Sequence, residues 1–128
     1  MSGDYGSSMP SHPLPEPVVE LVAQRFRALG EPLRIRLVEQ LMEGEASVGE
    51  LVSATGAGQQ NVSKHLGVLL RCGIVARRKH GTLVYYRITD PVVYSLCEQV
   101  CASLERQHAQ VSGMFAPRLE AVAGQPHD

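Results

Sequence analysis

The sequence predicts a mainly α-helical domain that carries one small β-hairpin. Three observations support this prediction. Apolar residues recur with a helical period through most of the chain, glycines stand at the expected helix ends, and one stretch after the middle changes to a β-prone pattern. At 128 residues the chain has room for one domain, and a core of this size is often completed by dimerisation.

The two ends of the chain differ in composition from its middle. Residues 1–15 are rich in Gly, Ser and Pro and lack the basic and apolar regions of a signal peptide, which predicts a disordered arm. We expect residues 16–110 to form the folded domain and residues 111–128 to form a helical extension with a frayed tail. No apolar run approaches the roughly 20 residues that a membrane span requires. An odd number of cysteines favours a reducing cytoplasm over a disulfide framework.

Three amphipathic helices are expected in the first half of the chain. Before the third, Ser47 and Glu50 have the spacing of a capping box, in which each side chain accepts a hydrogen bond from the other residue's backbone N–H. The helices are expected over residues 18–29, 32–43 and 48–55, each followed by a glycine, at positions 30, 44 and 56.

The next segment, "GQQNVSKHLGVLLRCG" (residues 58–73), predicts a helix with one apolar side. Val62, Leu66, Leu69 and Leu70 share a face when the segment is wound at 100° per residue. The other side carries hydrogen-bonding groups and no acid. A short helix, a glycine-containing turn and a second helix with a polar outer face make a helix-turn-helix.

The stretch "IVARRKHGTLVYYRI" (residues 74–88) predicts a β-hairpin with a tight turn at His80 and Gly81. Its tip would carry Arg77, Arg78, Lys79 and His80. A basic hairpin directly after a helix-turn-helix is a wing, so the fold class becomes a winged helix-turn-helix with the order α-α-α-α-β-β-α.

A last helix is expected after the hairpin, with Thr89 or Asp90 as its cap and Pro91 in its first turn. Its apolar stripe is too wide to remain uncovered, and we expect the first and last helices to form a dimer interface. The stripe consists of Val93, Leu96, Cys97, Val100, Cys101 and Leu104.

Charge is unevenly distributed along the chain. The formal net charge is only −1, yet no acidic residue falls between Glu50 and Asp90. The protein therefore has one basic face, despite its near-neutral total. The cations in this interval are Lys64, Arg71, Arg77, Arg78, Lys79 and Arg87.

A polar helix and a basic wing of this kind fit double-stranded DNA. Lys and Arg neutralise phosphates, while Gln and Asn suit adenine and Lys and Arg suit guanine in the major groove. The alternative is that this face is simply solvated, and for His65 a packed, hydrogen-bonded role is as reasonable as a phosphate contact. The candidate DNA contacts are Gln59, Gln60, Asn61, Ser63, Lys64, His65, Arg71, Arg77, Arg78 and Lys79.

Four short stretches together resemble the ArsR/SmtB family of winged-helix transcriptional repressors: "LGEPLRIRLV" (29–38), "VSKHL" (62–66), "GIV" (73–75) and "HGTLVYYRI" (80–88). The resemblance covers roughly residues 26–104. It implies a non-enzymatic repressor that binds an imperfect inverted repeat of operator DNA as a homodimer and is released by an inducer.

The resemblance does not extend to two metal sites of that family. One uses a Cys-x-Cys pair at the start of the third helix, and the other uses Asp-x-His at the start of the last helix with two further ligands about three turns later. The first pair is replaced here by Ser47 and Gly49, and the second set reads Asp90, Val92, Ser103 and Arg106.

The remaining candidate site is the pair Cys97 and Cys101. At an i, i+4 spacing their Cβ atoms are ~5–6 Å apart, close enough to share one soft metal or metalloid ion such as zinc, cadmium, mercury, copper(I) or arsenite. His108 lies on the same stripe but needs a partner chain to come near. Packing in the apolar stripe and a redox switch are the other open roles, although an i, i+4 disulfide strains its geometry. The cofactor therefore stays unknown.

Two functions of other classes also stay open. A winged helix can serve as a protein–protein interaction module without binding DNA, although the basic wing counts against it. A thiol-dependent enzyme would need an exposed thiol with a low pKa, whereas the stripe around Cys97 and Cys101 suggests burial. No acid–base constellation or phosphate loop supports an enzyme.

Overall fold

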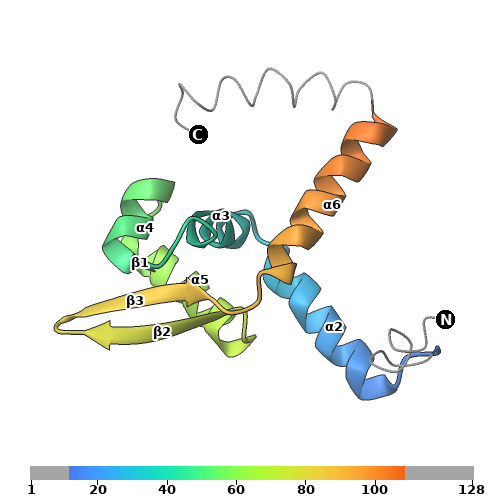
Figure 1. The fold of residues 1–128 in the computed structure, drawn as a ribbon, viewed down its shortest axis with the longest axis horizontal. Helices are drawn as coiled ribbons and strands as arrows, with labels where there is room; N and C mark the ends of the chain where they lie inside the picture. Colours follow the sequence, from blue (N-terminus) through green and yellow to red (C-terminus); the bar gives the residue numbers. More distant parts are fainter. Residues whose placement is uncertain (1–11, 109–128) are drawn as a thin grey trace. The chain divides into compact units, whose positions relative to one another are not determined.

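The computed structural model describes residues 12–108. Nearly all of the expected N-terminal arm and the whole of the expected extension over residues 111–128 lie outside this range. The chain divides into two compact units, the first ending at Pro91 and the second beginning at Val92. The described part is mainly helical with one small sheet, so the predicted fold class is confirmed (Figure 1).

Within residues 12–108, the first unit contains four helices and three strands, and the second unit contains one helix. The helices of the first unit are α2 (Glu16–Leu29), α3 (Pro32–Leu41), α4 (Val48–Thr55) and α5 (Gln59–Arg71). The strands are β1 (Ala46–Ser47), β2 (Val75–His80) and β3 (Leu83–Ile88), and the helix of the second unit is α6 (Val92–Gln107).

Local sequence signals fix the helix ends. The capping box before α4 is confirmed: the Ser47 hydroxyl accepts from the Glu50 backbone N–H at 3.1 Å, and the Glu50 carboxylate accepts from the Ser47 N–H at 2.9 Å. Gly56 ends α4 with a φ of 76°, in the left-handed region that glycine enters without steric cost. The sequence therefore encodes these ends through its caps and glycines.

The sheet contains one strand that the sequence did not predict. Its order is β1-β3-β2, with both pairings antiparallel, so β3 lies in the centre. The turn of the hairpin also differs from the prediction by one residue. Because His80 pairs with Leu83, the turn consists of Gly81 and Thr82, and Gly81 takes the positive φ of 65°.

The core of the first unit is built around α3, which contacts α2, α4, α5 and β3. Full burial of an aliphatic side chain stabilises a fold by roughly 1.5–3 kcal/mol, so each fully buried side chain of this core contributes on that scale. The largest fully buried side chains are Leu37, Val38, Leu51, Val62, Leu66, Leu69 and Ile74.

Thr89 and Asp90, which were expected to cap the last helix, directly follow β3 and bond to other residues. The Thr89 hydroxyl instead donates to the Gly73 carbonyl at 3.0 Å. The Asp90 carboxylate lies 3.2 Å from Arg25 Nη1, an ion pair without hydrogen-bond geometry. Both side chains therefore fasten the end of the hairpin to other parts of the first unit, and α6 begins directly after Pro91.

The side chain of Arg34 on α3 links α2 to α5. Its Nε donates to the Ala28 carbonyl at 2.6 Å, its Nη2 donates to the Arg27 carbonyl at 3.2 Å, and its Nη1 bonds to His65 Nδ1 at 2.8 Å. A guanidinium has only donors, so Nδ1 must accept, which requires a neutral ring with its proton on Nε2. His65 is 7 % exposed. Burial, reinforced by the positive charges of Arg34 and Lys64, holds its pKa below the ordinary value.

The lowered pKa of His65 predicts a loss of stability in acid. Unfolded, His65 titrates near pH 6.5; folded, it binds its proton only at lower pH. The contribution of neutral His65 to the free energy of unfolding is therefore complete above about pH 6.5. It is lost as the pH falls through the folded pKa, with a slope of at most about 1.4 kcal/mol per pH unit. Urea unfolding of His65→Gln, which does not titrate, should show a flatter pH profile than wild type between pH 5 and 8.

A matched control for this experiment is His80→Gln, because the His80 side chain is exposed on β2. Its profile should follow that of the wild-type protein. Parallel profiles for wild type and His65→Gln would contradict the proton linkage.

Candidate nucleic-acid interface

Helix α5 has one buried and one exposed side. Val62, His65, Leu66 and Leu69 are buried, because α5 packs against α3 and α4. Every predicted contact of this helix other than His65 is exposed, and none of the exposed residues is acidic. The exposed candidates are Gln59, Gln60, Asn61, Ser63, Lys64 and Arg71.

The side chain of Arg71 extends back along α5. A Cβ atom placed on Gly67 would lie 3.5 Å from Arg71 Nη1, so the guanidinium rests beside this glycine. Since i and i+4 positions are neighbours on a helix, Arg71 extends the polar surface that begins at Gln60 and Lys64. The polar surface is therefore continuous along most of the helix.

His65 has the packed role of the two that the sequence allowed. It lies in the core and bonds to Arg34, as described above. We therefore leave it out of the surface that is proposed below to contact DNA. Its partner Arg34 was not identified from the sequence, because the two residues are 31 positions apart.

The wing cations do not form one cluster, because neighbouring residues of a strand point to opposite faces. Arg77 and Lys79 share one face of the hairpin, and Arg78 lies on the other. All three side chains are exposed. The cross-strand pairs are Arg77–Tyr86, Arg78–Tyr85 and Lys79–Val84.

Arg78 is paired with an acid that sequence reasoning missed. Its Nε and Nη2 donate to the Glu45 carboxylate at 2.8 and 2.9 Å, and its guanidinium lies 5.2 Å from the centre of the Tyr85 ring. The hydrogen bond and charge of Arg78 hold the pKa of Glu45 below its ordinary value. Glu45 precedes the acid-free interval in the chain, yet the fold brings it to the wing.

The predicted metal residues lie on and next to α6. Cys97 is half-buried, Cys101 is exposed, and none of the three cysteines forms a disulfide. His108 directly follows the helix. Within residues 12–108 no three His, Cys, Asp or Glu side chains gather closely enough to hold a metal ion. In the described part of the chain, α6 therefore offers two thiols without a third ligand close enough to complete a site.

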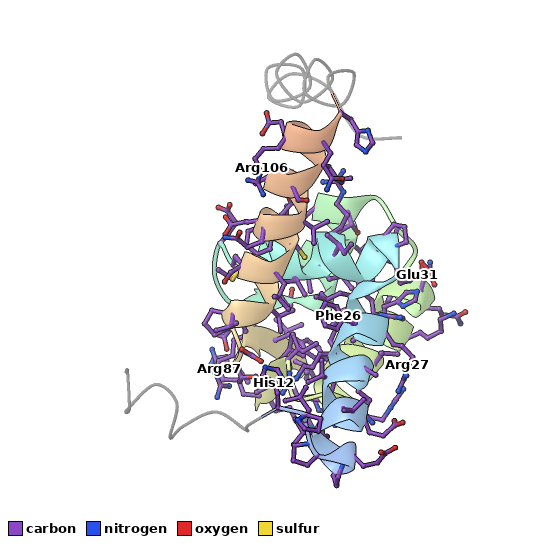
Figure 2. The ribbon with its side chains drawn as sticks, turned by 90° about the vertical axis from the view of Figure 1, so that its right-hand side faces the viewer. His12, Phe26, Arg27, Glu31, Arg87 and Arg106 are labelled. Atoms are coloured by element: carbon purple, nitrogen blue, oxygen red, sulfur yellow. The ribbon has the colours of Figure 1, made fainter. Side chains whose placement is uncertain are left out.

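Helices α2 and α6 each leave apolar side chains uncovered in the single chain. On α2, Phe26 is 55 % exposed and projects from the helix in the side-chain view (Figure 2). On α6, Val92 is 64 % and Val100 56 % exposed. Neither helix suits a membrane span, since the described chain has no helix that is both long and apolar enough for one.

Comparison with known proteins agrees with this geometry. Residues 31–77 match the model of the arsR family of bacterial regulatory proteins. An uncharacterized HTH-type transcriptional regulator of Mycobacterium tuberculosis is 44 % identical over 82 residues, which cover 63 % of this chain and 72 % of that protein. A crystal structure of this regulator aligns with a TM-score of 0.63 and 37 % identity, covering 82 % of this chain and 99 % of the other.

Two further solved structures are similar. The transcriptional repressor BigR from Xylella fastidiosa aligns with a TM-score of 0.62 and 38 % identity, covering 68 % of this chain and 89 % of the other. A homodimeric winged helix-turn-helix DNA-binding domain from Mycobacterium bovis aligns with a TM-score of 0.63 and 29 % identity, covering 77 % and 95 %. The chain therefore belongs to the arsR family of bacterial regulatory proteins, a family of winged helix-turn-helix transcriptional regulators and not of enzymes.

Proposed function

We propose that the protein is a cytoplasmic, homodimeric repressor that binds an inverted-repeat operator in double-stranded DNA and is released by an inducer. The exposed side of α5 is the observation that carries this proposal. It presents amide, hydroxyl and basic groups without an acid, while the opposite side is held in the core. Such a surface suits a phosphate backbone and the edges of bases at once.

The N-terminal half of α5 would enter the major groove. Gln60 and Asn61 can bond an adenine edge, and Lys64 can bond guanine or a phosphate. The wing would follow the flanking backbone through its cations. A winged helix that bound only other proteins would show no salt-dependent affinity for a duplex. This difference distinguishes a DNA-binding repressor from a protein–protein interaction module.

A homodimer would cover the exposed apolar residues of α2 and α6. The similar domain from M. bovis is described as homodimeric, and the exposed Phe26 and Val100 give this chain the apolar surface for such an interface. Two recognition helices about one helical turn of DNA apart would then read the two halves of the operator.

The inducer is proposed to act on α6. A ligand that binds more tightly to a conformer with the wrong helix spacing shifts the protein away from DNA in proportion to that difference in affinity. Cys97 and Cys101 are the candidate ligands of a soft metal or metalloid ion, with other donors from the partner chain. An oxidant or a small organic molecule is the alternative signal.

Replacing Gln60 and Lys64 together with Ala should weaken operator binding at least tenfold, because loss of a bidentate base contact costs about 1–3 kcal/mol. Fluorescence anisotropy with a labelled duplex from the region upstream of the gene would measure this. Arg36→Ala removes a half-buried cation of α3 that is paired with Glu39 at 2.9 Å and lies outside the proposed contact set, and this variant should bind like the wild-type protein. Unchanged affinity of the double variant would show that α5 is not the recognition helix.

Ending the chain at Val92 should convert the dimer into a monomer, because the truncation removes the apolar stripe of α6. Analytical ultracentrifugation at micromolar concentration would report the mass, and circular dichroism would check that the helices of the first unit persist. A folded, dimeric truncated protein would place the interface elsewhere.

Release from DNA by one ion should depend on the two α6 thiols. We would titrate the reduced protein, bound to the labelled duplex, with zinc, nickel, cadmium and arsenite in turn, alongside a Cys97→Ser/Cys101→Ser variant. A soft ion should release the wild-type protein and leave the variant bound. Cys72→Ser, at the end of α5, serves as the matched thiol control. Binding that no ion disturbs would remove the metal hypothesis.

A further inference from the structure

We infer that Glu45 and Arg78 form a clip that fixes the orientation of the wing, and that Arg77 and Lys79, not Arg78, are the wing residues that contact phosphate. This inference rests on the proposed function, since it assigns separate roles to the three wing cations. It names two positioning residues that lie outside the recognition helix.

The clip spans the whole width of the sheet. Strand β3 lies between β1 and β2; Glu45 directly precedes β1, and Arg78 is in the middle of β2. The register places Arg78 and Ser47 both opposite Tyr85, so they share its face of the sheet. The ion pair therefore crosses β3 over the Tyr85 ring, 5.2 Å below the guanidinium, and ties the two outer strands together.

The geometry of the pair commits Arg78 to Glu45. Two N–H groups of one guanidinium meet the two oxygens of one carboxylate at 2.8 and 2.9 Å, the bidentate arrangement that makes the strongest Arg–carboxylate pairs. Cation–π contact with Tyr85 adds a third restraint. A phosphate that recruited this guanidinium would have to displace a carboxylate that already uses the same donors.

The other two wing cations are free of this constraint. Arg77 and Lys79 lie on the opposite face of β2 by strand alternation, and both are exposed. The ion pairs found within residues 12–108 do not include either of them. Their charges are therefore available to a phosphate backbone, whereas the charge of Arg78 is balanced locally.

The clip reaches the helix-turn-helix through Ser47. This residue ends β1 and also caps α4, whose packing against α5 holds the recognition helix. Fastening β2 to the residue before β1 therefore fixes the wing relative to α4 and α5. Without the clip, the hairpin would retain its β2–β3 pairing but lose one of its attachments at the β1 side.

Glu45→Gln separates this role from simple electrostatics. If Glu45 only competed with DNA for Arg78, removing its charge would tighten binding and steepen the dependence of log Kd on log salt by about 1. If the clip positions the wing, affinity should fall about three- to tenfold with an unchanged salt slope. Glu43→Gln removes the same charge from an exposed position two residues away and is the matched control.

Two further variants complete the test. The exchange Glu45→Arg/Arg78→Glu rebuilds the pair with reversed charges and should recover affinity relative to Glu45→Gln. If Arg78 instead contacted a phosphate, the glutamate at position 78 would repel the DNA and binding would weaken further. Arg77→Ala/Lys79→Ala should lower the salt slope by about 2. Thermal unfolding by circular dichroism would confirm that each variant is folded.

Wild-type binding separates this inference from the proposed function. Anisotropy would be measured with a labelled duplex from the upstream region and with an unrelated duplex of equal length, over a series of salt concentrations. Absence of salt-dependent binding to both duplexes would overturn the DNA-binding proposal itself. Normal wild-type binding, with tighter and more salt-dependent binding by Glu45→Gln, would overturn the clip alone.

Discussion

The burial of one side of α5 is the constraint on which the rest of the structure depends. Val62, Leu66 and Leu69 have no exposed surface, so the helix cannot rotate without exposing them. This fixes which side chains face outward. Packing of the apolar side thus determines which side chains of α5 are exposed. A residue of α5 can contact DNA only if α3 and α4 do not cover it.

Polar contacts add direction to this packing. Arg34 uses one guanidinium to bond the last turn of α2 and the buried face of α5, so this side chain connects the two helices. Glu45 and Arg78 make the corresponding link between the two outer strands. Apolar contacts hold these elements together, and the two arginines add distance and angle requirements that apolar contacts lack.

The sequence predicted local features well and long-range pairings poorly. Both ends of α4 were predictable because Ser47 and Gly56 act within one turn of the chain. The start of α6 was not, because Thr89 and Asp90, the expected caps, bond to residues far away in the sequence. Strand β1 was missed because it is only two residues long and its partner Tyr86 is 40 positions from Ala46. The sequence contains no periodicity that marks so short a strand.

The candidate site divides in the same way. Helical periodicity was enough to predict the polar side of α5, but it left a packed role and a phosphate contact equally open for His65. In the structure His65 is buried with Val62, Leu66 and Leu69. The acid on the wing is not predictable from the order of charges along the chain, because Glu45 and Arg78 are 33 positions apart and meet only in the fold. Counting charges by segment gives the net field of a region but not its individual pairs.

Ser47 both ends β1 and caps α4, and this double role restricts how the protein could change during evolution. One metal site of the family places a cysteine at this position, but here its hydroxyl completes the capping box of α4. A thiol is a weaker hydrogen-bond acceptor, and loss of an N-cap typically costs about 1 kcal/mol. A descendant that gained a cysteine at position 47 would therefore weaken the first helix of its own DNA-reading motif for as long as that side chain remained a neutral thiol.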